Sequence, residues 1–401
     1  MHIPFVDLRA QHDELRGPLE TVIREVIDQS AFVGGERVEA FERQFAAASG
    51  ARFAVACANG TDALKLALMA AGVRPGDEVV TVAHTFIATV EAITLLGAQP
   101  VFVDIDATYH LSPERLAHFL ADDCYIGLDG RPINRHTGRP VTAVIPVHLY
   151  GLVADMAPLL ELAARYRLKV VEDACQAHGA TYDLNDVERG AGSLGVAGAF
   201  SFYPGKNLGG LGEGGAVTTN TSALDCLMRR WREHGQLHKY YHISAEGWNS
   251  RLDTLQCAVL SLKLGKLAEW NAQRRRVAAW YRERLADEEQ VSLPVEPEGR
   301  RHVYHLFVVQ VPNRDRLREL LDEQGIATGL HYPLPLHLQP AYQYLGWQAG
   351  DLPQTEAAAH TILSLPMYPH LTESQVDYVC DALHHALAGQ PRPVIVAQRA
   401  A

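Results

Sequence analysis

The sequence predicts an α/β fold, with a mostly parallel β-sheet flanked by helices and a smaller α+β domain at the C-terminal end. Short apolar runs alternate with helix-like segments from about residue 53 to residue 220, which is typical of a parallel sheet covered on both faces. The alternation stops after about residue 262. Because 401 residues exceed one ordinary core, we expect a large domain over 1–262 and a smaller one over 263–401.

The helices and strands of the large domain are predicted from the spacing of apolar residues and from the glycines that end each segment. TDALKLALMAAGV (61–73) has apolar residues at helical spacing and closes near Gly72. TFIATVEAITLLG (85–97) and MAPLLELAARYR (156–167) are further predicted helices. The predicted strands lie within 52–60, 77–84, 99–105, 142–151, 169–176, 196–203 and 214–220.

The remaining segments show a different pattern. Residues 122–140 are polar and rich in turn formers, which predicts a surface loop or a small hairpin. Residues 262–286 predict one long amphipathic helix that bridges to the second domain. A strand over 304–311 and helices over 314–325 and 373–387 follow.

Composition narrows the class of protein. Hydrophobic residues make up 47% and charged residues 21% of a chain with net charge −11, so we expect a soluble protein without a nucleic-acid partner. No signal-like start and no apolar run of bilayer length occur, so we expect a cytoplasmic protein without a membrane partner. The six cysteines lack metal-type spacing, which predicts reduced thiols and no metal site.

One lysine stands out in a chain that mostly uses arginine. Six of its 36 Lys and Arg residues are lysines, and Lys206 lies in the glycine-rich stretch AFSFYPGKNLGGLGEGGAVTTN (199–220). An amine can lose its proton and attack a carbonyl, whereas a guanidinium stays charged. The alternative is an ordinary solvated lysine on a loop.

Two more candidates follow predicted strands, at the sheet edge where ligands bind in such folds. Gly60 and Thr61 would open a helix whose N–H groups could hold a phosphate, or would belong to a plain helix cap. Asp173 would leave a buried strand at the same edge. Its carboxylate could pair with a protonated ring nitrogen, bind a metal or cap the next helix.

Together these residues offer a phosphate cradle, a carboxylate and an amine. Pyridoxal phosphate needs an anchor for its phosphate, a carboxylate that keeps its pyridine nitrogen protonated and an amine for a Schiff base. The loop around Lys206 has neither the P-loop nor the dinucleotide-binding spacing. We therefore predict pyridoxal 5'-phosphate as the cofactor.

Several long segments also match one known family in the expected order. EDACQAHGA (172–180), SFYPGKNLGGLGEGGAV (201–217) and GWNSRLDTLQCAVL (247–260) carry the likeness, which extends from PFVDLRAQ to LSLPMYPHLT. They resemble the DegT/DnrJ/StrS family of pyridoxal-phosphate-dependent nucleotide-sugar aminotransferases. The resemblance implies the aspartate aminotransferase-like fold, fold type I of these transferases.

The resemblance implies roles around the cofactor ring. Lys206 would form the Schiff base and then move a proton during transamination. Asp173 would pair with the pyridine nitrogen, and Gln176 would bond the phenolic oxygen. Phe86 would stack on the ring, although core packing is the alternative for a Phe after a strand.

It also implies how the phosphate is held and how subunits assemble. The phosphate would lie against the N–H groups of Gly60 and Thr61 and the hydroxyl of Ser201. Asn249 would reach the phosphate in a neighbouring subunit, and Arg251 would face the substrate there. The protein would then be an isologous homodimer with shared active sites.

The implied reaction is a two-step transfer. L-glutamate would convert the cofactor to pyridoxamine 5'-phosphate and leave as 2-oxoglutarate, and a keto-sugar on a nucleoside diphosphate would then accept the amine with ping-pong kinetics. His331 and Tyr332 match a family segment near the sugar; a turn set by the flanking prolines is the alternative.

The run HGQ…YYHISAEGWNSRLDTLQ is more similar to family members that aminate carbon 3 than to those that aminate carbon 4. UDP-linked 3-keto-N-acetylglucosaminuronate and dTDP-linked 3-keto-6-deoxy sugars are the two substrate types it suggests. A carbon-4 sugar or an aminocyclitol is the alternative. Trp248 and the long 122–140 insertion depart from the family pattern and could reshape the sugar pocket.

The residues disfavour three other classes of protein. A non-catalytic regulator on the same fold would be expected to lose Lys206 or Asp173, and both are present. Sugar-dehydrating relatives carry histidine in place of the lysine. A pure nucleotide-binding module would not need a Schiff-base lysine.

Overall fold

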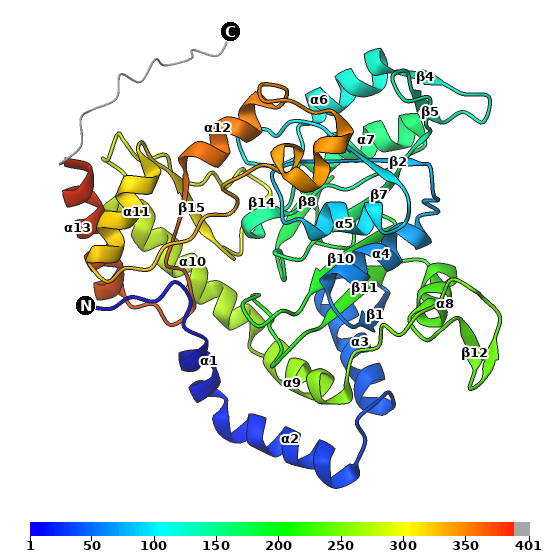
Figure 1. Cartoon of the computed structure of the whole chain (residues 1–401). Coiled ribbons are helices and arrows are strands. Elements are labelled where there is room, and N and C mark those ends of the chain that lie inside the picture. The colour runs from blue at the N-terminus through cyan, green and yellow to red at the C-terminus, as the bar shows by residue number, and fades with distance from the viewer. Residues whose placement is uncertain (389–401) are drawn as a thin grey trace.

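The structure, a computed structural model, describes residues 1–388. A seven-stranded sheet in the order β1-β11-β10-β7-β6-β2-β3 forms the centre of the molecule (Figure 1). Of these seven strands, β11 alone runs in the direction opposite to the other six. The predicted mostly parallel α/β sheet is thus confirmed. The strands are β1 (Phe53–Cys57), β2 (Glu78–Thr81), β3 (Gln99–Phe102), β6 (Val141–Val144), β7 (Lys169–Asp173), β10 (Ala197–Ser201) and β11 (Gly215–Thr219).

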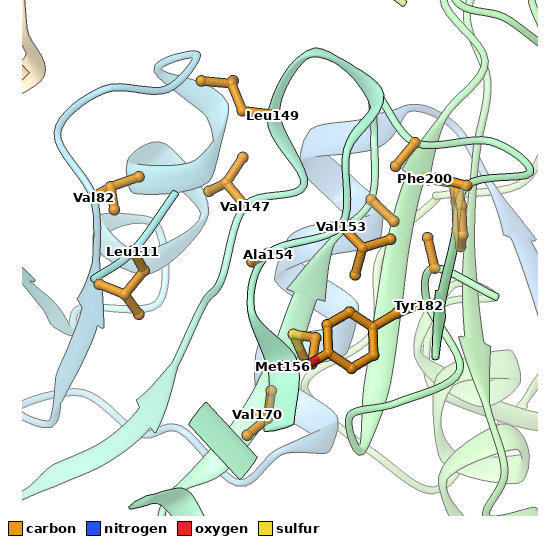
Figure 2. Packing of buried hydrophobic residues seen from close by; sticks show 14 of the residues in the cluster. Val82, Leu111, Val147, Leu149, Val153, Ala154, Met156, Val170, Tyr182 and Phe200 are labelled. Atoms are coloured by element: carbon orange, nitrogen blue, oxygen red, sulfur yellow. The ribbon is translucent and has the colours of Figure 1, made fainter. Parts of the chain in front are cut away.

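Helices cover both faces of this sheet. Val170 and Val171 are neighbours on β7 but belong to opposite apolar clusters, because successive side chains of a strand point to opposite faces. Figure 2 shows part of the cluster that contains Val170, where Met156 and Tyr182 pack close to it. One face is covered by α4 (Gly60–Ala70), α5 (Ala88–Thr94) and α8 (Ser222–Trp231), and the other by α3 (Glu36–Ala48), α6 (Pro113–His118), α7 (Met156–Tyr166) and α9 (Thr254–Leu264).

The C-terminal part has its own apolar cluster. The antiparallel pair β15 (Phe307–Gln310) and β16 (Ile362–Leu365) packs with α10 (Leu267–Arg284), α11 (Arg314–Glu323) and α13 (Glu373–Ala388). Ile3 joins this cluster and bridges to Ile326, which brings the N-terminus beside α13 (Figure 1). The domain boundary at residue 262 stays a prediction.

The single long helix predicted over 262–286 is wrong. α9 ends at Leu264 and α10 begins at Leu267. Gly265 stands at the break, where a residue without a side chain costs helix stability. The remaining helices and strands are α1 (Leu8–Glu14), α2 (Arg16–Gln29), α12 (Pro353–Thr361), β8 (Thr181–Leu184), β9 (Val187–Gly190), β14 (Arg300–Arg301), the π-turn Phe119–Asp123 and the 3₁₀ turns Leu149–Gly151, Leu336–Leu338 and Pro340–Leu345.

Two hairpins project from the body (Figure 1). Residues 122–140 contain β4 (Cys124–Ile126) paired with β5 (Pro132–Asn134), as the small-hairpin prediction had it. The second hairpin pairs β12 (Gln236–His238) with β13 (Tyr241–His242). Among residues 1–388, no helix combines the length and the apolarity that crossing a bilayer requires.

Candidate active site

A cavity of about 650 Å³ opens where the parallel strands β1, β2, β7 and β10 end. The carboxyl ends of such strands meet at one edge of the sheet, so residues far apart in sequence come together there. Nine residues predicted for the site line this cavity: Gly60, Thr61, Phe86, Asp173, Gln176, Ser201, Lys206, His331 and Tyr332. Asn249 and Arg251 do not.

The first turn of α4 forms one end of the cavity. Asn59 is the helix cap, and its side chain accepts a hydrogen bond from Asp62 N at 2.8 Å. Within residues 1–388 the N–H groups of Gly60 and Thr61 make no hydrogen bond. A Cβ on Gly60 would lie 2.7 Å from Ser201 Cβ, so glycine lets this turn approach β10. Free N–H groups at a helix start suit an anion.

Asp173 ends β7 and is 5% exposed. Its Oδ2 accepts a hydrogen bond from Thr89 Oγ1 at 2.7 Å, and its Oδ1 accepts one from Cys175 N at 3.2 Å. No helix follows within residues 174–180, so helix capping, one of the alternatives for Asp173, is wrong. Sequence reasoning missed Thr85 and Thr89, although their i, i+4 spacing beside Phe86 was visible in AHTFIAT.

The loop that carries Lys206 is fixed on both sides. Asn207 Nδ2 donates to Asn271 Oδ1 at 2.9 Å and to Val303 O at 3.1 Å. The Gly209 carbonyl accepts a hydrogen bond from Lys263 Nζ at 2.5 Å. Both contacts come from segments far along the chain, so tertiary packing determines where the loop lies.

Burial lowers the pKa of the Lys206 amine, and the nearby Cys175 and Asp173 oppose this shift. A lower pKa raises the fraction of neutral amine, which is the nucleophilic form. Lys206 is therefore suited to covalent chemistry with a carbonyl inside the cavity.

Gln176 and Tyr332 connect the large sheet to the C-terminal part. Gln176 Oε1 accepts a hydrogen bond from Tyr150 N at 2.8 Å, and its Nε2 donates to Tyr332 OH at 3.1 Å. Phe86 lies 6.0 Å from the Tyr332 ring and is 54% exposed, which disfavours the core-packing alternative.

His331 is held by residues from both ends of the chain. Its Nδ1 lies 2.8 Å from Ser364 Oγ, and its ring stacks on Phe5 at 5.5 Å between centroids. A Cβ on Gly329 would lie 2.6 Å from the His331 ring, so glycine makes room for this stack. Burial, followed by the charge of Lys206, lowers the pKa of His331 to about 4, so the imidazole is neutral at pH 7.

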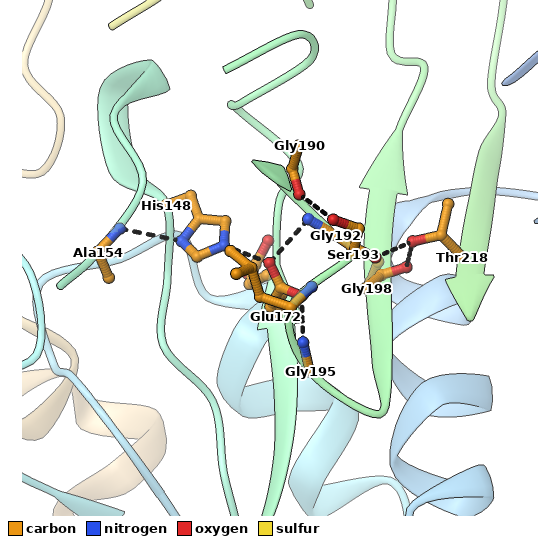
Figure 3. Close-up of polar contacts among 12 residues, drawn as sticks. His148, Ala154, Glu172, Gly190, Gly192, Ser193, Gly195, Gly198 and Thr218 are labelled. Carbon is orange, nitrogen blue, oxygen red and sulfur yellow. Dashed lines mark hydrogen bonds and ion pairs between the residues drawn. The ribbon is translucent and has the colours of Figure 1, made fainter. Parts of the chain in front are cut away.

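The residue before Asp173 on β7, Glu172, carries a buried carboxylate that holds this strand in place (Figure 3). Glu172 is fully buried and accepts hydrogen bonds from the N–H groups of Gly192, Leu194 and Gly195 at 2.6–2.7 Å. His148 Nδ1 accepts from Ala154 N, so its proton is on Nε2, which donates to Glu172 at 2.9 Å. This network fixes the turn before β10 against β7.

Asn249 and Arg251 lie away from the cavity. Asn249 is exposed, and its backbone forms an isolated antiparallel β-bridge with Glu233 next to the β12–β13 hairpin. Arg251 pairs with Glu233 at 2.8 Å. Within this chain these two side chains do not contribute to the site.

Comparison with known proteins shows the family of this chain. The model of the DegT/DnrJ/EryC1/StrS aminotransferase family matches residues 16–384. The chain belongs to this family. Its members are aminotransferases that depend on pyridoxal phosphate. The family inferred from the sequence motifs is confirmed.

Three relatives of this family member match nearly full length. A "pleiotropic regulatory protein" of Geobacillus stearothermophilus is 44% identical, over 96% of this chain and 98% of the relative. A dTDP-3-amino-3,4,6-trideoxy-α-D-glucose transaminase of Streptomyces venezuelae is 43% identical, over 95% of each chain. A UDP-N-acetyl-3-dehydro-α-D-glucosamine 3-aminotransferase of Acidithiobacillus ferrooxidans is 40% identical, over 96% and 98%.

The fold agrees as well. The crystal structure of DesV from S. venezuelae, in complex with a ketimine intermediate, has a TM-score of 0.89 and 41% identity. The match covers 98% of this chain and all of that one. The predicted fold of pyridoxal-phosphate-dependent transferases is therefore confirmed.

The residues of this DegT/DnrJ/EryC1/StrS aminotransferase fit pyridoxal phosphate. The free N–H groups of Gly60 and Thr61 suit the phosphate, and the Asp173 carboxylate faces the same cavity as Lys206. Among residues 1–388, no group of three or more His, Cys, Asp or Glu side chains is arranged to hold a metal ion.

Proposed function

We propose that this aminotransferase transfers the amino group of L-glutamate to carbon 3 of a keto-sugar linked to UDP or dTDP, for amino-sugar biosynthesis. The observation that carries the proposal is the cavity itself, where a desolvated lysine, a hydrogen-bonded carboxylate and free N–H groups share one space. The names of two relatives place the amino group on carbon 3, one on a dTDP sugar and one on a UDP sugar.

Each residue has a distinct part in this proposal. Lys206 would hold the cofactor covalently, Asp173 would keep its ring nitrogen protonated, and Gly60, Thr61 and Ser201 would hold its phosphate. Bound there, pyridoxal phosphate supplies an electron sink for the carbon that loses its proton. Lys206 Nζ would move that proton, and its lowered pKa raises the fraction of neutral amine that can act as a base.

The walls of the cavity orient the two substrates. Phe86 would stack on the cofactor ring, and Gln176 would bond its phenolic oxygen. His331 and Tyr332, which line the same cavity, would contact the sugar. Because His331 is neutral at pH 7, it can bond a sugar hydroxyl without adding positive charge.

The first experiment is an absorbance titration with pyridoxal phosphate, followed by L-glutamate. We expect a visible band that disappears when L-glutamate is added and returns with 2-oxoglutarate. Lys206→Ala should lack the band, while Lys169→Ala, at an exposed lysine on β7, should keep it. A parent protein with a band that no amino donor changes would favour the regulator suggested by one relative's name.

The position of amination needs a product analysis. The protein loaded with amino groups should be offered 3-keto and 4-keto sugars of UDP and dTDP in a single turnover. Mass spectrometry and NMR of the product then locate the new amine. Transfer to the 4-keto sugars alone would contradict the carbon-3 proposal.

The proposal includes a homodimer with shared sites. The β12–β13 hairpin and its flank expose Leu237, Tyr240, Tyr241 and Ile243, at 46–82% of their surface. Clustered apolar residues on a projecting hairpin favour an interface. Asn249 and Arg251 lie beside it and outside this chain's own cavity, as residues serving a second subunit would.

Mixed dimers test the sharing directly. Lys206→Ala and Arg251→Ala should each be inactive alone. After subunit exchange, half of the dimers are hybrids with one intact site of two, so about a quarter of the parent activity should return. No recovery in hybrids, or a protein that sediments as a monomer, would rule out shared sites.

A further inference from the structure

Two buried threonines in the wall of the cavity form a hydrogen-bonded chain to the Asp173 carboxylate. Thr89 Oγ1 donates to Asp173 Oδ2 at 2.7 Å, and Thr85 Oγ1 lies 2.9 Å from Thr89 Oγ1. A threonine hydroxyl has one proton, and that of Thr89 is used on Asp173. Thr85 must therefore donate to Thr89, so both hydroxyl groups point their protons along one chain toward the carboxylate.

We propose that Thr89, supported by Thr85, is a positioning residue that fixes the Asp173 carboxylate for the pyridine nitrogen of the cofactor. The proposal rests on the proposed function, which places that nitrogen against Asp173. Thr89 itself touches the carboxylate, and its effect on the reaction passes through Asp173.

The backbone alone leaves this carboxylate free to turn. Asp173 N donates to Pro146 O at 3.0 Å and Asp173 O accepts from His148 N at 2.9 Å, which fixes the main chain. The terminal torsion of an aspartate is broad, however. Cys175 N reaches Oδ1 at 3.2 Å, so the shorter bond from Thr89 to Oδ2 is the one that selects an orientation.

Burial makes the threonine difficult to replace. Thr89 is 1% exposed and Thr85 2% exposed, so water has little access to their hydroxyl groups. Donors in a chain also polarise one another, which strengthens the final bond to the carboxylate. The same five-residue segment supplies Phe86 to the cavity, so one piece of chain lines the site and orients its acid.

The test compares three variants of the full-length protein. Thr89→Val removes the hydroxyl at nearly constant shape, and Thr89→Ser keeps it. Thr142→Val is the matched control, because Thr142 is a buried threonine on β6 whose Oγ1 has no partner among the described residues. Each protein is prepared without cofactor, and its unfolding in urea is recorded first.

Two further measurements follow for each protein. A spectral titration gives the dissociation constant for pyridoxal phosphate. Rapid mixing with L-glutamate then gives the rate constant of the spectral change at saturation and the concentration for half-saturation.

We expect Thr89→Val to weaken cofactor binding and to slow the saturated spectral change by roughly 10-fold or more, the size of a lost hydrogen bond to a charged group. The half-saturating L-glutamate concentration should stay within about twofold, because Thr89 is 1% exposed and its hydroxyl proton is already used on Asp173. Thr89→Ser should recover most of both losses, and Thr142→Val should match the parent.

Parent-like binding and rate in Thr89→Val would overturn the proposal. So would a Thr89→Ser variant as impaired as Thr89→Val, since the methyl group would then be what matters. A change in urea stability alone would show a purely structural role. If the parent itself binds no pyridoxal phosphate, the proposed function fails first and this inference falls with it.

Discussion

Gln176 and Tyr332 are 156 residues apart in the chain, yet Gln176 Nε2 donates to Tyr332 OH at 3.1 Å. This bond links the end of β7 to the segment that precedes the 3₁₀ turn at Leu336. It thereby joins a residue assigned to the cofactor with one assigned to the sugar.

We expect Tyr332→Phe to act on the sugar step rather than on cofactor binding. The variant removes one neutral hydrogen bond, so the KM for the nucleotide sugar should rise about fivefold while the affinity for pyridoxal phosphate stays near the parent value. Steady-state kinetics at saturating L-glutamate measure this. Tyr344→Phe, at an exposed tyrosine, is the control. Loss of cofactor affinity in Tyr332→Phe would contradict the assignment.

Gly60→Ala should weaken cofactor binding without unfolding the protein. Its new Cβ would lie 2.7 Å from Ser201 Cβ and 3.3 Å from Cys175 Sγ, so α4 or β10 must shift where the phosphate is expected. We expect the dissociation constant for pyridoxal phosphate to rise at least about tenfold, with inorganic phosphate competing less well. Gly17→Ala has nothing within 4 Å and should change neither quantity. Unchanged binding in Gly60→Ala would place the phosphate elsewhere.

Glu172→Gln should destabilise the fold. Glu172 accepts three backbone N–H groups and the Nε2 proton of His148, and a glutamine NH₂ can accept none of them. One oxygen remains as an acceptor, so at least one buried donor loses its partner, at about 2–3 kcal/mol in the free energy of unfolding. Urea unfolding measures this, with Glu161→Gln on the exposed side of α7 as control. Equal stability of both variants would refute the expectation.

Lys263 predicts a pH dependence of stability. Lys263 is 1% exposed, and burial lowers the pKa of its amine from 10.5 to about 8. Below pH 8 the amine is charged in both states, and the folded state carries the cost of burial. Between about pH 8 and pH 10.5 the unfolded chain binds more protons, so the free energy of unfolding should rise with pH through this window.

Lys263→Met should lose that rise. At pH 7 the variant avoids a burial cost of up to about 3 kcal/mol, less the lost bond to Gly209, and this advantage should vanish by pH 10.5. Urea unfolding at several pH values measures the difference between variant and parent. Lys169→Met, at an exposed lysine, is the control. A difference that is constant across pH would contradict the shifted pKa.

The sequence by itself determined the alternating elements of the large sheet and the chemical parts of the site. The spacing of apolar residues and the glycines at the ends of elements are local signals, so β1, α4, β2 and β7 could be predicted from neighbouring residues. Lys206, Asp173 and Gly60 could be singled out because each combines an unusual residue type with a strand end. Apolar residues keep their helical spacing across Gly265, so the sequence pattern over 262–286 did not reveal that the helix ends there and a second one begins.

Only the tertiary structure decided what surrounds those residues. Thr89 reaches Asp173 across 84 positions and Phe5 reaches His331 across most of the chain, because parallel strand ends and the N-terminal segment converge on one cavity. Local patterns hold no information on such contacts, since sheet order and the packing of two apolar clusters set them. The same convergence leaves Asn249 and Arg251 outside the cavity of their own chain, in agreement with the resemblance that assigns them to a neighbouring subunit.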